Sequence, residues 1–206
     1  MNKKIEQFVN LFEAENRKLN LCKFGDREEF IKRHVMDSWE AGQFLEDSRK
    51  VVDLGTGGGL PGLILAIEKP DIEFTLIDSV RKKCDSVDIM AKELELSNVD
   101  VVCGRAEELG HEMREVFDAA TARALAPLPV LLELAAGFIR PGGLFIAYKG
   151  SKYLQELEEA KNAIEILGFE LEKIHHYERV LLIFRKTKSL SSKYPRKNGT
   201  PKKRPL

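Results

Sequence analysis

The chain has 206 residues, of which 43% are hydrophobic and 32% charged, proportions typical of a folded domain and not of a disordered chain. No uncharged apolar run approaches the roughly 20 residues of a membrane-spanning helix, and residues 1–10 lack the apolar stretch of a secretory signal. Three scattered cysteines without a C-x-x-C pair predict neither a disulfide framework nor a metal site. We expect a cytoplasmic protein with no membrane partner, and a monomer.

The net charge of zero hides an uneven distribution. Residues 179–206 contain ten Lys or Arg residues and no Asp or Glu, which leaves 23 basic against 33 acidic residues in the rest of the chain. A basic tail on an acidic body indicates a polyanionic partner, because Lys and Arg gain affinity by displacing counterions from phosphates. Charge alone is equally compatible with a solvated or disordered tail that aids solubility.

The first 48 residues are predicted to be helical. Apolar residues at helical spacing favour a helix over about residues 3–18. Asp26 followed by Glu29 resembles a capping box, which would open a second helical region that reaches about residue 46. Residues 1–48 therefore form an N-terminal helical extension in this interpretation.

From residue 49 onward, short β-branched runs alternate with helical stretches. The predicted strands cover residues 51–54, 74–77, 99–103, 117–121 and 144–148. The predicted helices cover about residues 80–94, 127–138 and 152–167, and a further helix begins near Pro61. Strands that alternate with helices predict a parallel sheet covered on both faces.

The end of the chain breaks this alternation. Residues 169–176 and 180–184 are predicted strands joined by a short turn, so they should run antiparallel. Residues 188–206 turn to Lys, Ser, Pro and Gly and should form a basic C-terminal arm, either structured or flexible. The predicted fold is α/β and Rossmann-like, a mostly parallel sheet over residues 49–187 that ends in an antiparallel hairpin.

A glycine-rich loop follows the first predicted strand. Residues 53–62 read DLGTGGGLPG, and glycines let the backbone turn sharply and a ligand approach closely. Their spacing satisfies both the dinucleotide pattern G-x-G-x-x-G and the D-x-G-x-G-x-G pattern of S-adenosylmethionine (SAM) methyltransferases. The second pattern uses Asp53, Gly55, Gly57 and Gly59. A purely structural turn is disfavoured by the number of glycines.

Asp78 ends the second predicted strand. Its carboxylate could accept hydrogen bonds from two ribose hydroxyls of NAD or SAM, or it could cap the helix that begins near residue 80. The combination of strand, loop and acid favours the ligand role. The terminal hairpin, and the small amount of chain left for a separate substrate domain, favour SAM over a nicotinamide cofactor.

The nature of the methyl acceptor is narrowed by two missing signatures. The segment after the fourth strand, residues 121–124, reads TARA and not the N-P-P-Y type motif of exocyclic-amine methylation. No cysteine has the setting of a nucleophile for methylation at pyrimidine carbon. A nucleophile with a free lone pair remains, such as guanine N7. Such an acceptor must be held in line with the sulfonium methyl and needs no general base.

Four segments together resemble the RsmG family of bacterial 16S ribosomal RNA guanine-N7 methyltransferases, also called glucose-inhibited division protein B. They are DLGTGGGLPG at 53–62, RHVMDS at 33–38, TARA at 121–124 and YPRKNGTP at 194–201. The resemblance extends over nearly the whole chain. It implies that SAM methylates N7 of guanine 527 without a dedicated general base, on 16S rRNA or the 30S particle.

The resemblance also implies the residues of the cofactor site. Together with Asp78, they are Gly55, Leu60, Ala106, Glu107 and Arg123, supported by Asp53, Gly57 and Gly59. Glu107 is expected near the adenine; the alternative is a solvated residue in the first turn of a short helix. Arg123 is expected beside the methionyl carboxylate or the RNA, in a positioning role; the alternative is a surface ion pair. No residue is assigned to catalysis itself.

The expected RNA contacts are basic residues of the N-terminal region, the fifth strand and the tail. They are Arg33, His34, Lys149, Lys193, Arg196, Lys197, Lys202, Lys203 and Arg204. A structural role is the commoner one for a residue like His34, and Asp37 could simply pair locally. Three rival functions stay open: a SAM methyltransferase for another RNA or a small molecule, a NAD-binding oxidoreductase, and a non-catalytic rRNA-binding assembly factor.

Overall fold

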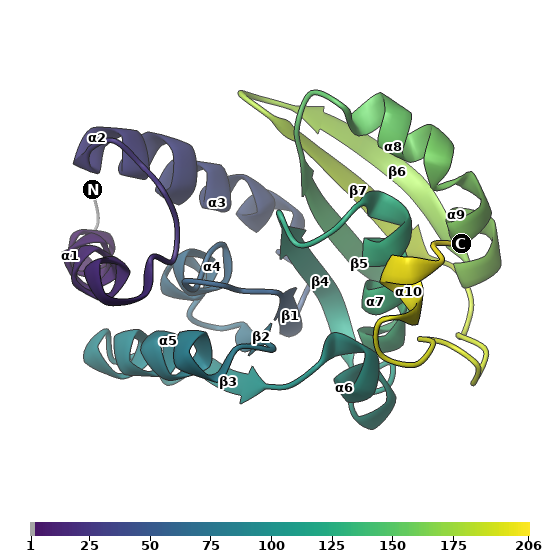
Figure 1. Ribbon diagram of the computed structural model, residues 1–206, viewed down its shortest axis with the longest axis horizontal. Helices are drawn as coiled ribbons and strands as arrows, with labels where there is room; N and C mark the ends of the chain where they lie inside the picture. The colour runs from purple at the N-terminus through teal and green to yellow at the C-terminus, as the bar shows by residue number, and fades with distance from the viewer. Residues whose placement is uncertain (1–2) are drawn as a thin grey trace.

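Seven strands form a single sheet in the computed structural model, which describes residues 3–206 (Figure 1). The strands are β1 Lys50–Leu54, β2 Glu73–Asp78, β3 Val99–Cys103, β4 Phe117–Arg123, β5 Ile139–Lys149, β6 Phe169–His176 and β7 Val180–Lys186. Their order is β3-β2-β1-β4-β5-β7-β6. The first five strands run parallel, and β7 pairs antiparallel with both β5 and β6. The mostly parallel sheet and its terminal hairpin are confirmed.

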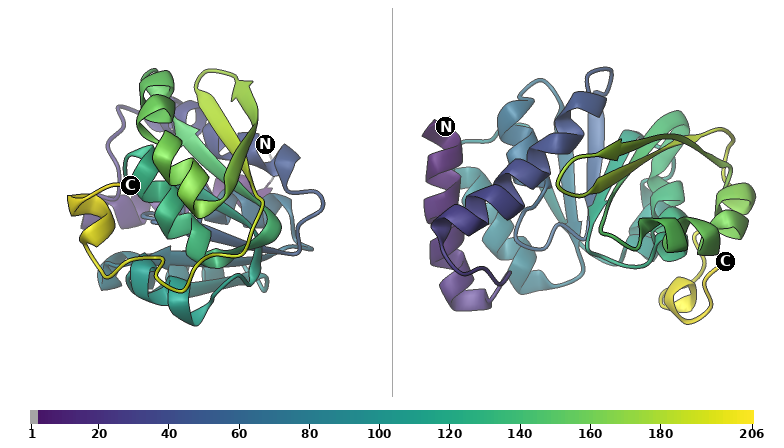
Figure 2. Two further views of the ribbon diagram at one scale, coloured as in Figure 1. Left: turned by 90° about the vertical axis from the view of Figure 1, so that its right-hand side faces the viewer. Right: turned by 90° about the horizontal axis from the view of Figure 1, so that it is seen from above.

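Helices cover both faces of the sheet (Figures 1 and 2). One face carries α1 Lys3–Leu19, α2 Arg27–Phe30, α3 Asp37–Trp39, α4 Gly62–Glu68 and α5 Arg81–Glu93. The other carries α6 Ala106–Glu112, α7 Leu128–Phe138, α8 Tyr153–Glu159, α9 Lys161–Leu167 and α10 Thr200–Lys203. Within residues 3–206, no helix has the length and apolar character needed to cross a membrane.

The second helical region begins as predicted and then departs from regular α-helix. The Asp26 carboxylate accepts a hydrogen bond from the Glu29 N–H at 2.8 Å, which confirms the cap. Ile31–Met36 is a π-helix (η1), and Glu40–Phe44 is a 3-10 helix (η2). The hydrogen bonds of a π-helix join residues five apart instead of four. Phe30 and Val35, at this segment, are both fully buried.

Two further elements differ from the prediction. The helix expected over residues 152–167 is divided at the fully buried Ala160, so α8 and α9 are separate. The fifth strand begins at Ile139, before the Pro-Gly-Gly turn, because Ile139 already pairs with Phe117. The register shifts between Phe117 and Ala119, which accommodates the turn as an irregularity within the strand.

The N-terminal helices share a hydrophobic core with the sheet. Phe12 of α1 stacks on Phe30 of α2 with ring centroids 4.5 Å apart, and both side chains are fully buried. The Phe12 ring also lies under the glycine-rich loop, where a Cβ on Gly58 would come within 2.6 Å of it. The helical extension thus supports the loop directly.

The C-terminal segment is packed against the domain. Of the two forms considered for the basic arm, structured or flexible, the structure shows the structured one. Tyr194 and Pro201 are buried. The Arg114 guanidinium of the α6–β4 connection donates to the carbonyl oxygens of Tyr194 and Leu190 at 2.8 and 2.5 Å. Internal hydrogen bonds and apolar anchors therefore fix the tail against α6 and α7 (Figure 2).

We expect the Phe12→Ala substitution to lower the free energy of unfolding by about 3–5 kcal/mol, because it opens a cavity between α1, α2 and the loop. Chemical denaturation monitored by circular dichroism measures this change. A loss below about 1 kcal/mol, or an α1 that unfolds in a separate transition, would contradict the shared core.

Candidate functional site

The glycine-rich loop crosses the carboxyl ends of the central strands. Gly55, Gly57 and Gly59 have φ angles of 70°, 59° and 86°, which side-chain-bearing residues rarely adopt. The N–H groups of Gly55 and Thr56 both donate to the Ile77 carbonyl oxygen of β2 at 2.9 Å. This loop is therefore tied to the neighbouring strand as well as to its own.

Asp53 anchors the loop from beneath. Its side chain is fully buried and accepts hydrogen bonds from the Thr121 hydroxyl at 2.8 Å and the Gly62 N–H at 3.1 Å. Burial raises the pKa of this carboxyl, and the two donors oppose the shift. Because no oxygen of Asp53 reaches the surface, it supports the site without facing a ligand.

Asp78 joins the loop to the segment that leads into α5. One carboxylate oxygen accepts the Gly57 N–H at 3.0 Å, and the other accepts the Val80 N–H at 2.9 Å, at the start of α5. The residue is 8% exposed at the carboxyl end of β2. It fixes the residue that precedes α5 and the second glycine of the loop, but no side-chain hydrogen bond caps the helix itself.

Glu107 is buried, so the alternative of a solvated residue is wrong. Its carboxylate accepts the N–H of Gly199, in the C-terminal segment, at 3.0 Å, and lies 3.4 Å from the Arg105 guanidinium. Burial alone would raise the pKa of this carboxyl, but the Gly199 N–H and Arg105 outweigh it and the net shift is downward. The Glu107 carboxylate thus binds the C-terminal segment. The backbone of Ala106 and Glu107 lies just beyond the carboxyl end of β3, at the start of α6.

Arg123 forms a buried ion pair, not the surface pair considered above. Its guanidinium lies 3.0 Å from the Asp37 carboxylate, and the two side chains are only 11% and 4% exposed. Asp37 also accepts the Tyr177 hydroxyl at 2.5 Å and lies 3.6 Å from the Arg179 guanidinium. One carboxylate therefore connects α3, β4 and the turn of the β6–β7 hairpin.

His34 has a structural environment. Its ring stacks on Phe30 with centroids 5.4 Å apart, and Nδ1 lies 3.4 Å from the Arg123 guanidinium. Burial, aided by the positive charge of Arg123, lowers the pKa of His34 to about 4. The imidazole is therefore neutral at pH 7 and carries no charge toward RNA.

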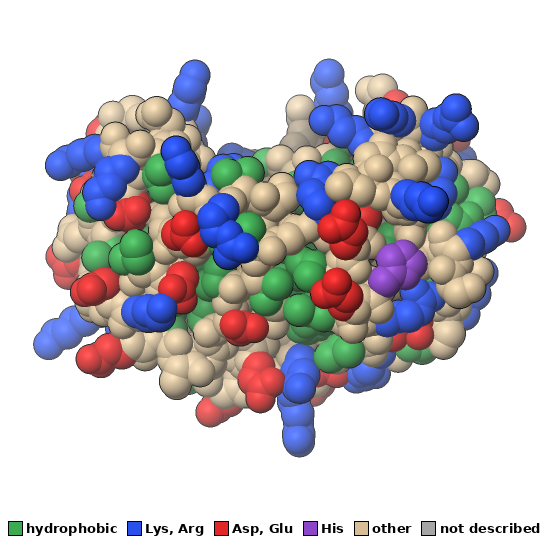
Figure 3. All heavy atoms as spheres, turned by 60° about the horizontal axis from the view of Figure 1, so that its bottom comes forward, with side chains coloured by type: hydrophobic (Ala, Val, Ile, Leu, Met, Phe, Trp, Pro, Cys, Tyr) green, Lys and Arg blue, Asp and Glu red, His purple; other side chains and the backbone are tan. Residues whose placement is uncertain are grey.

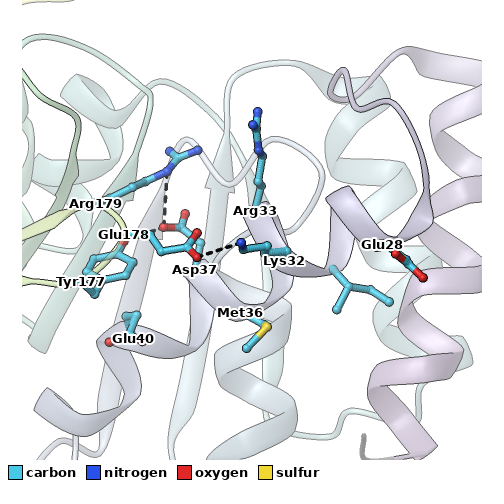
Figure 4. Close-up of a pocket in the computed structure, with 10 residues that line it drawn as sticks. Glu28, Lys32, Arg33, Met36, Asp37, Glu40, Tyr177, Glu178 and Arg179 are labelled. Atoms are coloured by element: carbon cyan, nitrogen blue, oxygen red, sulfur yellow. Dashed lines mark hydrogen bonds and ion pairs between the residues drawn. The ribbon is translucent and has the colours of Figure 1, made fainter.

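Two hollows flank the Arg123–Asp37 pair. A groove of about 710 Å³ runs between η1 and the hairpin turn; its lining includes Arg33, Met36, Asp37, Tyr177 and Arg179 (Figure 4). A second, of about 480 Å³, lies at the carboxyl ends of β4 and β5 and includes Arg123, Tyr148, Lys149 and Arg179. Gly57, Asp78 and Glu107 line neither hollow.

Sequence patterns did not single out Tyr177, Arg179 or Gly199. Tyr177 and Arg179 lie beside the hairpin turn, where the spacing carries no signal of a contact with α3. Leu60, which was predicted at the cofactor site, is 5% exposed and follows the loop into the core.

Two predicted RNA contacts are internally paired instead. Lys149 is buried, and its ammonium donates to Glu156 at 2.6 Å and to the Ala126 carbonyl oxygen at 3.1 Å. Arg196 holds the fully buried Glu133 through several hydrogen bonds. Each of these cationic groups compensates a carboxylate within the fold, and their contact with RNA stays a prediction. Arg33, Lys193, Lys197, Lys202, Lys203 and Arg204 are exposed.

Known structures share this fold at low sequence identity. The O-methyltransferase TomG from Streptomyces achromogenes, in complex with SAM, superposes with a TM-score of 0.62 at 15% identity, over 91% of each chain. TYW2 from M. jannaschii, in complex with AdoMet, gives a TM-score of 0.61 at 15% identity, over 74% of this chain and 76% of its own. The sheet order and the terminal hairpin, shared with these structures, are those of the class I SAM-dependent methyltransferase fold.

Sequence comparison then identifies the family. A sequence model of rRNA small subunit methyltransferase G matches residues 1–184. The Ribosomal RNA small subunit methyltransferase G of Clostridium novyi is 38% identical over all of this chain and 90% of its own length. That of Desulfitobacterium hafniense is 40% identical over 93% of this chain and 83% of its own. The chain belongs to the rRNA small subunit methyltransferase G family, as its motifs suggested.

The depressed pKa of His34 predicts a pH dependence of stability. Between pH 6.5 and about 4 the unfolded chain protonates this residue and the folded chain does not, so acidification favours unfolding. We expect His34→Gln to reduce the loss of stability across this window by about 1–2 kcal/mol after allowance for solvent screening. Denaturation at several pH values measures it, with His176→Gln, at an exposed histidine, as the control. An unchanged slope in His34→Gln would contradict the assignment.

Proposed function

We propose that the protein transfers a methyl group from SAM to N7 of a guanine in small-subunit ribosomal RNA. By the family resemblance the target is guanine 527, on 16S rRNA or the 30S particle in the cytoplasm. The observation that carries the proposal is the loop and acid pair at the carboxyl ends of β1 and β2 in a chain of this family. The exposed basic tail supports RNA as the substrate class.

The loop fits SAM because it exposes bare backbone at the ends of the strands. No side chain lies within 4 Å of the position that a Cβ on Gly57 would take, so this point admits a ligand. Asp78 retains unused lone pairs on both oxygens for ribose hydroxyls. We assign the cofactor contacts to Gly55, Leu60, Asp78, Ala106, Glu107 and Arg123. When bound, SAM supplies an activated methyl group on its sulfonium.

Tyr148, His34 and Asp37, which lie near Arg123, suit an acceptor that needs no deprotonation. Burial raises the pKa of Tyr148 well above its usual value, so its phenol keeps its proton. His34, with a pKa of about 4, is a weak base at neutral pH. Asp37 is occupied by Arg123 and Tyr177. These residues favour N7, whose lone pair is free, and leave positioning as the main task of the site.

The docked tail offers a cationic surface for phosphates. Lys193, Lys197, Lys202, Lys203 and Arg204 are exposed. On the face in Figure 3, Lys and Arg side chains gather most densely at the upper right, while acidic and apolar side chains occupy the centre. Such contacts position an RNA without reading its sequence.

The proposed reaction is testable in cells that lack the gene. Borohydride and aniline cleave RNA at 7-methylguanosine, and primer extension maps the cut. We expect a single cut at the target guanine of 16S rRNA that returns with the wild-type gene. Complementation without the cut, in cells that produce the folded protein, would contradict the proposal.

Gly55→Asp should abolish SAM binding, because a side chain and a charge enter the loop where φ is 70°. Isothermal calorimetry measures the affinity. Gly142→Asp is the matched control, since Gly142 has a φ of 83° but lies near the start of β5, away from the carboxyl ends of the parallel strands. Undiminished affinity in Gly55→Asp would contradict the assigned site.

Replacing Lys197, Lys202, Lys203 and Arg204 with glutamine should weaken RNA binding and spare SAM affinity. The slope of log affinity against log salt should fall by about one for each phosphate that the tail no longer neutralises. Glutamine at Lys18, Lys50, Lys92 and Lys161, exposed cations outside the tail, controls for net charge. If both sets change the slope equally, the tail is not the RNA-binding surface.

A further inference from the structure

A continuous chain of contacts joins the proposed cofactor site to the C-terminal segment. The Arg105 guanidinium donates to the Ser79 hydroxyl, next to Asp78, and to the Glu107 carboxylate, both at 3.4 Å. Glu107 in turn accepts the Gly199 N–H at 3.0 Å. Residues at the carboxyl ends of β2 and β3 are therefore coupled to a segment about 90 residues further along the chain.

The carboxylate of Glu107 is committed to this contact. It is 5% exposed, and its pKa is shifted downward despite burial, with Gly199 the largest stabilising partner. Hydrogen bonds to charged acceptors are stronger than neutral ones. With the side chain turned to the tail, the backbone of Ala106 and Glu107 is the part left to meet a ligand beyond β3.

The conformation and packing of the tail fix the position of the Gly199 N–H group. Gly199 has a φ of 77° and precedes α10. Pro195 packs between Gly110 and Gly137, where added Cβ atoms would lie 3.2 and 3.1 Å from its ring. The Pro195 carbonyl oxygen is 2.8 Å from the His111 ring. The segment thus rests on α6, the same helix that carries Glu107.

We propose that residues 194–203 form a wall of the cofactor site, in which the Gly199 N–H positions Glu107 and so sets the backbone that faces the adenosine end of SAM. This inference rests on the proposed function for the location of the cofactor. It also links the cofactor site to RNA binding, because the same segment carries Lys197, Lys202 and Lys203, which are exposed.

Coupling of this kind is reciprocal. If the docked tail raises the affinity for SAM, then SAM holds the tail in place by the same factor. The cationic side chains of the tail are then best ordered when the cofactor is bound. The SAM-bound protein, which can transfer a methyl group, therefore offers RNA the full set of phosphate contacts from the tail.

Two substitutions at one position test the contact between the tail and Glu107. Gly199→Pro removes the N–H and also excludes the φ of 77°, because proline fixes φ at about −65°. Gly199→Ala keeps the N–H, and its added Cβ meets no atom within 4 Å, although a side chain is strained at this φ. We expect Gly199→Pro to weaken SAM binding about tenfold, equal to 1.4 kcal/mol, and Gly199→Ala to weaken it much less. Calorimetry measures both, and thermal unfolding verifies that both variants fold. Equal affinities in Gly199→Pro and wild type would overturn the proposal.

Hydrogen exchange on the unaltered protein provides a second measurement. Saturating SAM should slow the exchange of the Gly199 amide. It should also slow the Lys203 and Arg204 amides at the end of α10, which donate to the carbonyl oxygens of Gly199 and Thr200. Exchange rates in the tail that are the same with and without SAM would overturn the proposal. If Gly55→Asp also binds SAM normally, the cofactor site itself is misplaced; if Gly55→Asp abolishes binding and only the tail results fail, the wall alone is wrong.

Discussion

A single buried carboxylate determines where the glycine-rich loop lies. Asp53, at the end of β1, accepts hydrogen bonds from Thr121 on β4 and from Gly62 at the start of α4. Losing one donor would leave a buried carboxyl oxygen without a hydrogen bond, at a cost of about 1–3 kcal/mol. Strand, neighbouring strand and helix are therefore locked together, and the loop between them returns to β2, where Gly57 meets Asp78. The proposed cofactor site depends on this arrangement.

A second carboxylate builds the substrate side from remote parts of the chain. Asp37 in α3 holds Arg123 of β4 together with Tyr177 and Arg179 of the hairpin. The N-terminal helices thus contribute a carboxylate to the proposed substrate side. Their aromatic core under Gly58 joins them to the loop. Both carboxyl groups are buried, so their oxygens need hydrogen-bond donors from the protein. The elements that supply these donors are thereby held in fixed positions around each carboxyl group.

Much of this fold follows from local patterns in the sequence. The alternation of strands and helices, the Asp26 cap and the short link to the last strand all depend on neighbouring residues. Contacts between distant residues have no such signal. The burial of Lys149, the pair of Arg196 with Glu133 and the bond from Gly199 to Glu107 each join separate elements. Some basic residues that the sequence suggests for RNA binding therefore form ion pairs within the fold.

The most direct test of the account is methyl transfer by the purified protein. It would be incubated with methyl-labelled SAM and 30S particles from cells that lack the gene, and the digested RNA would be examined by mass spectrometry. The account predicts labelled 7-methylguanosine at one site of 16S rRNA. Label in another nucleoside, or none from a protein that binds SAM, would contradict it.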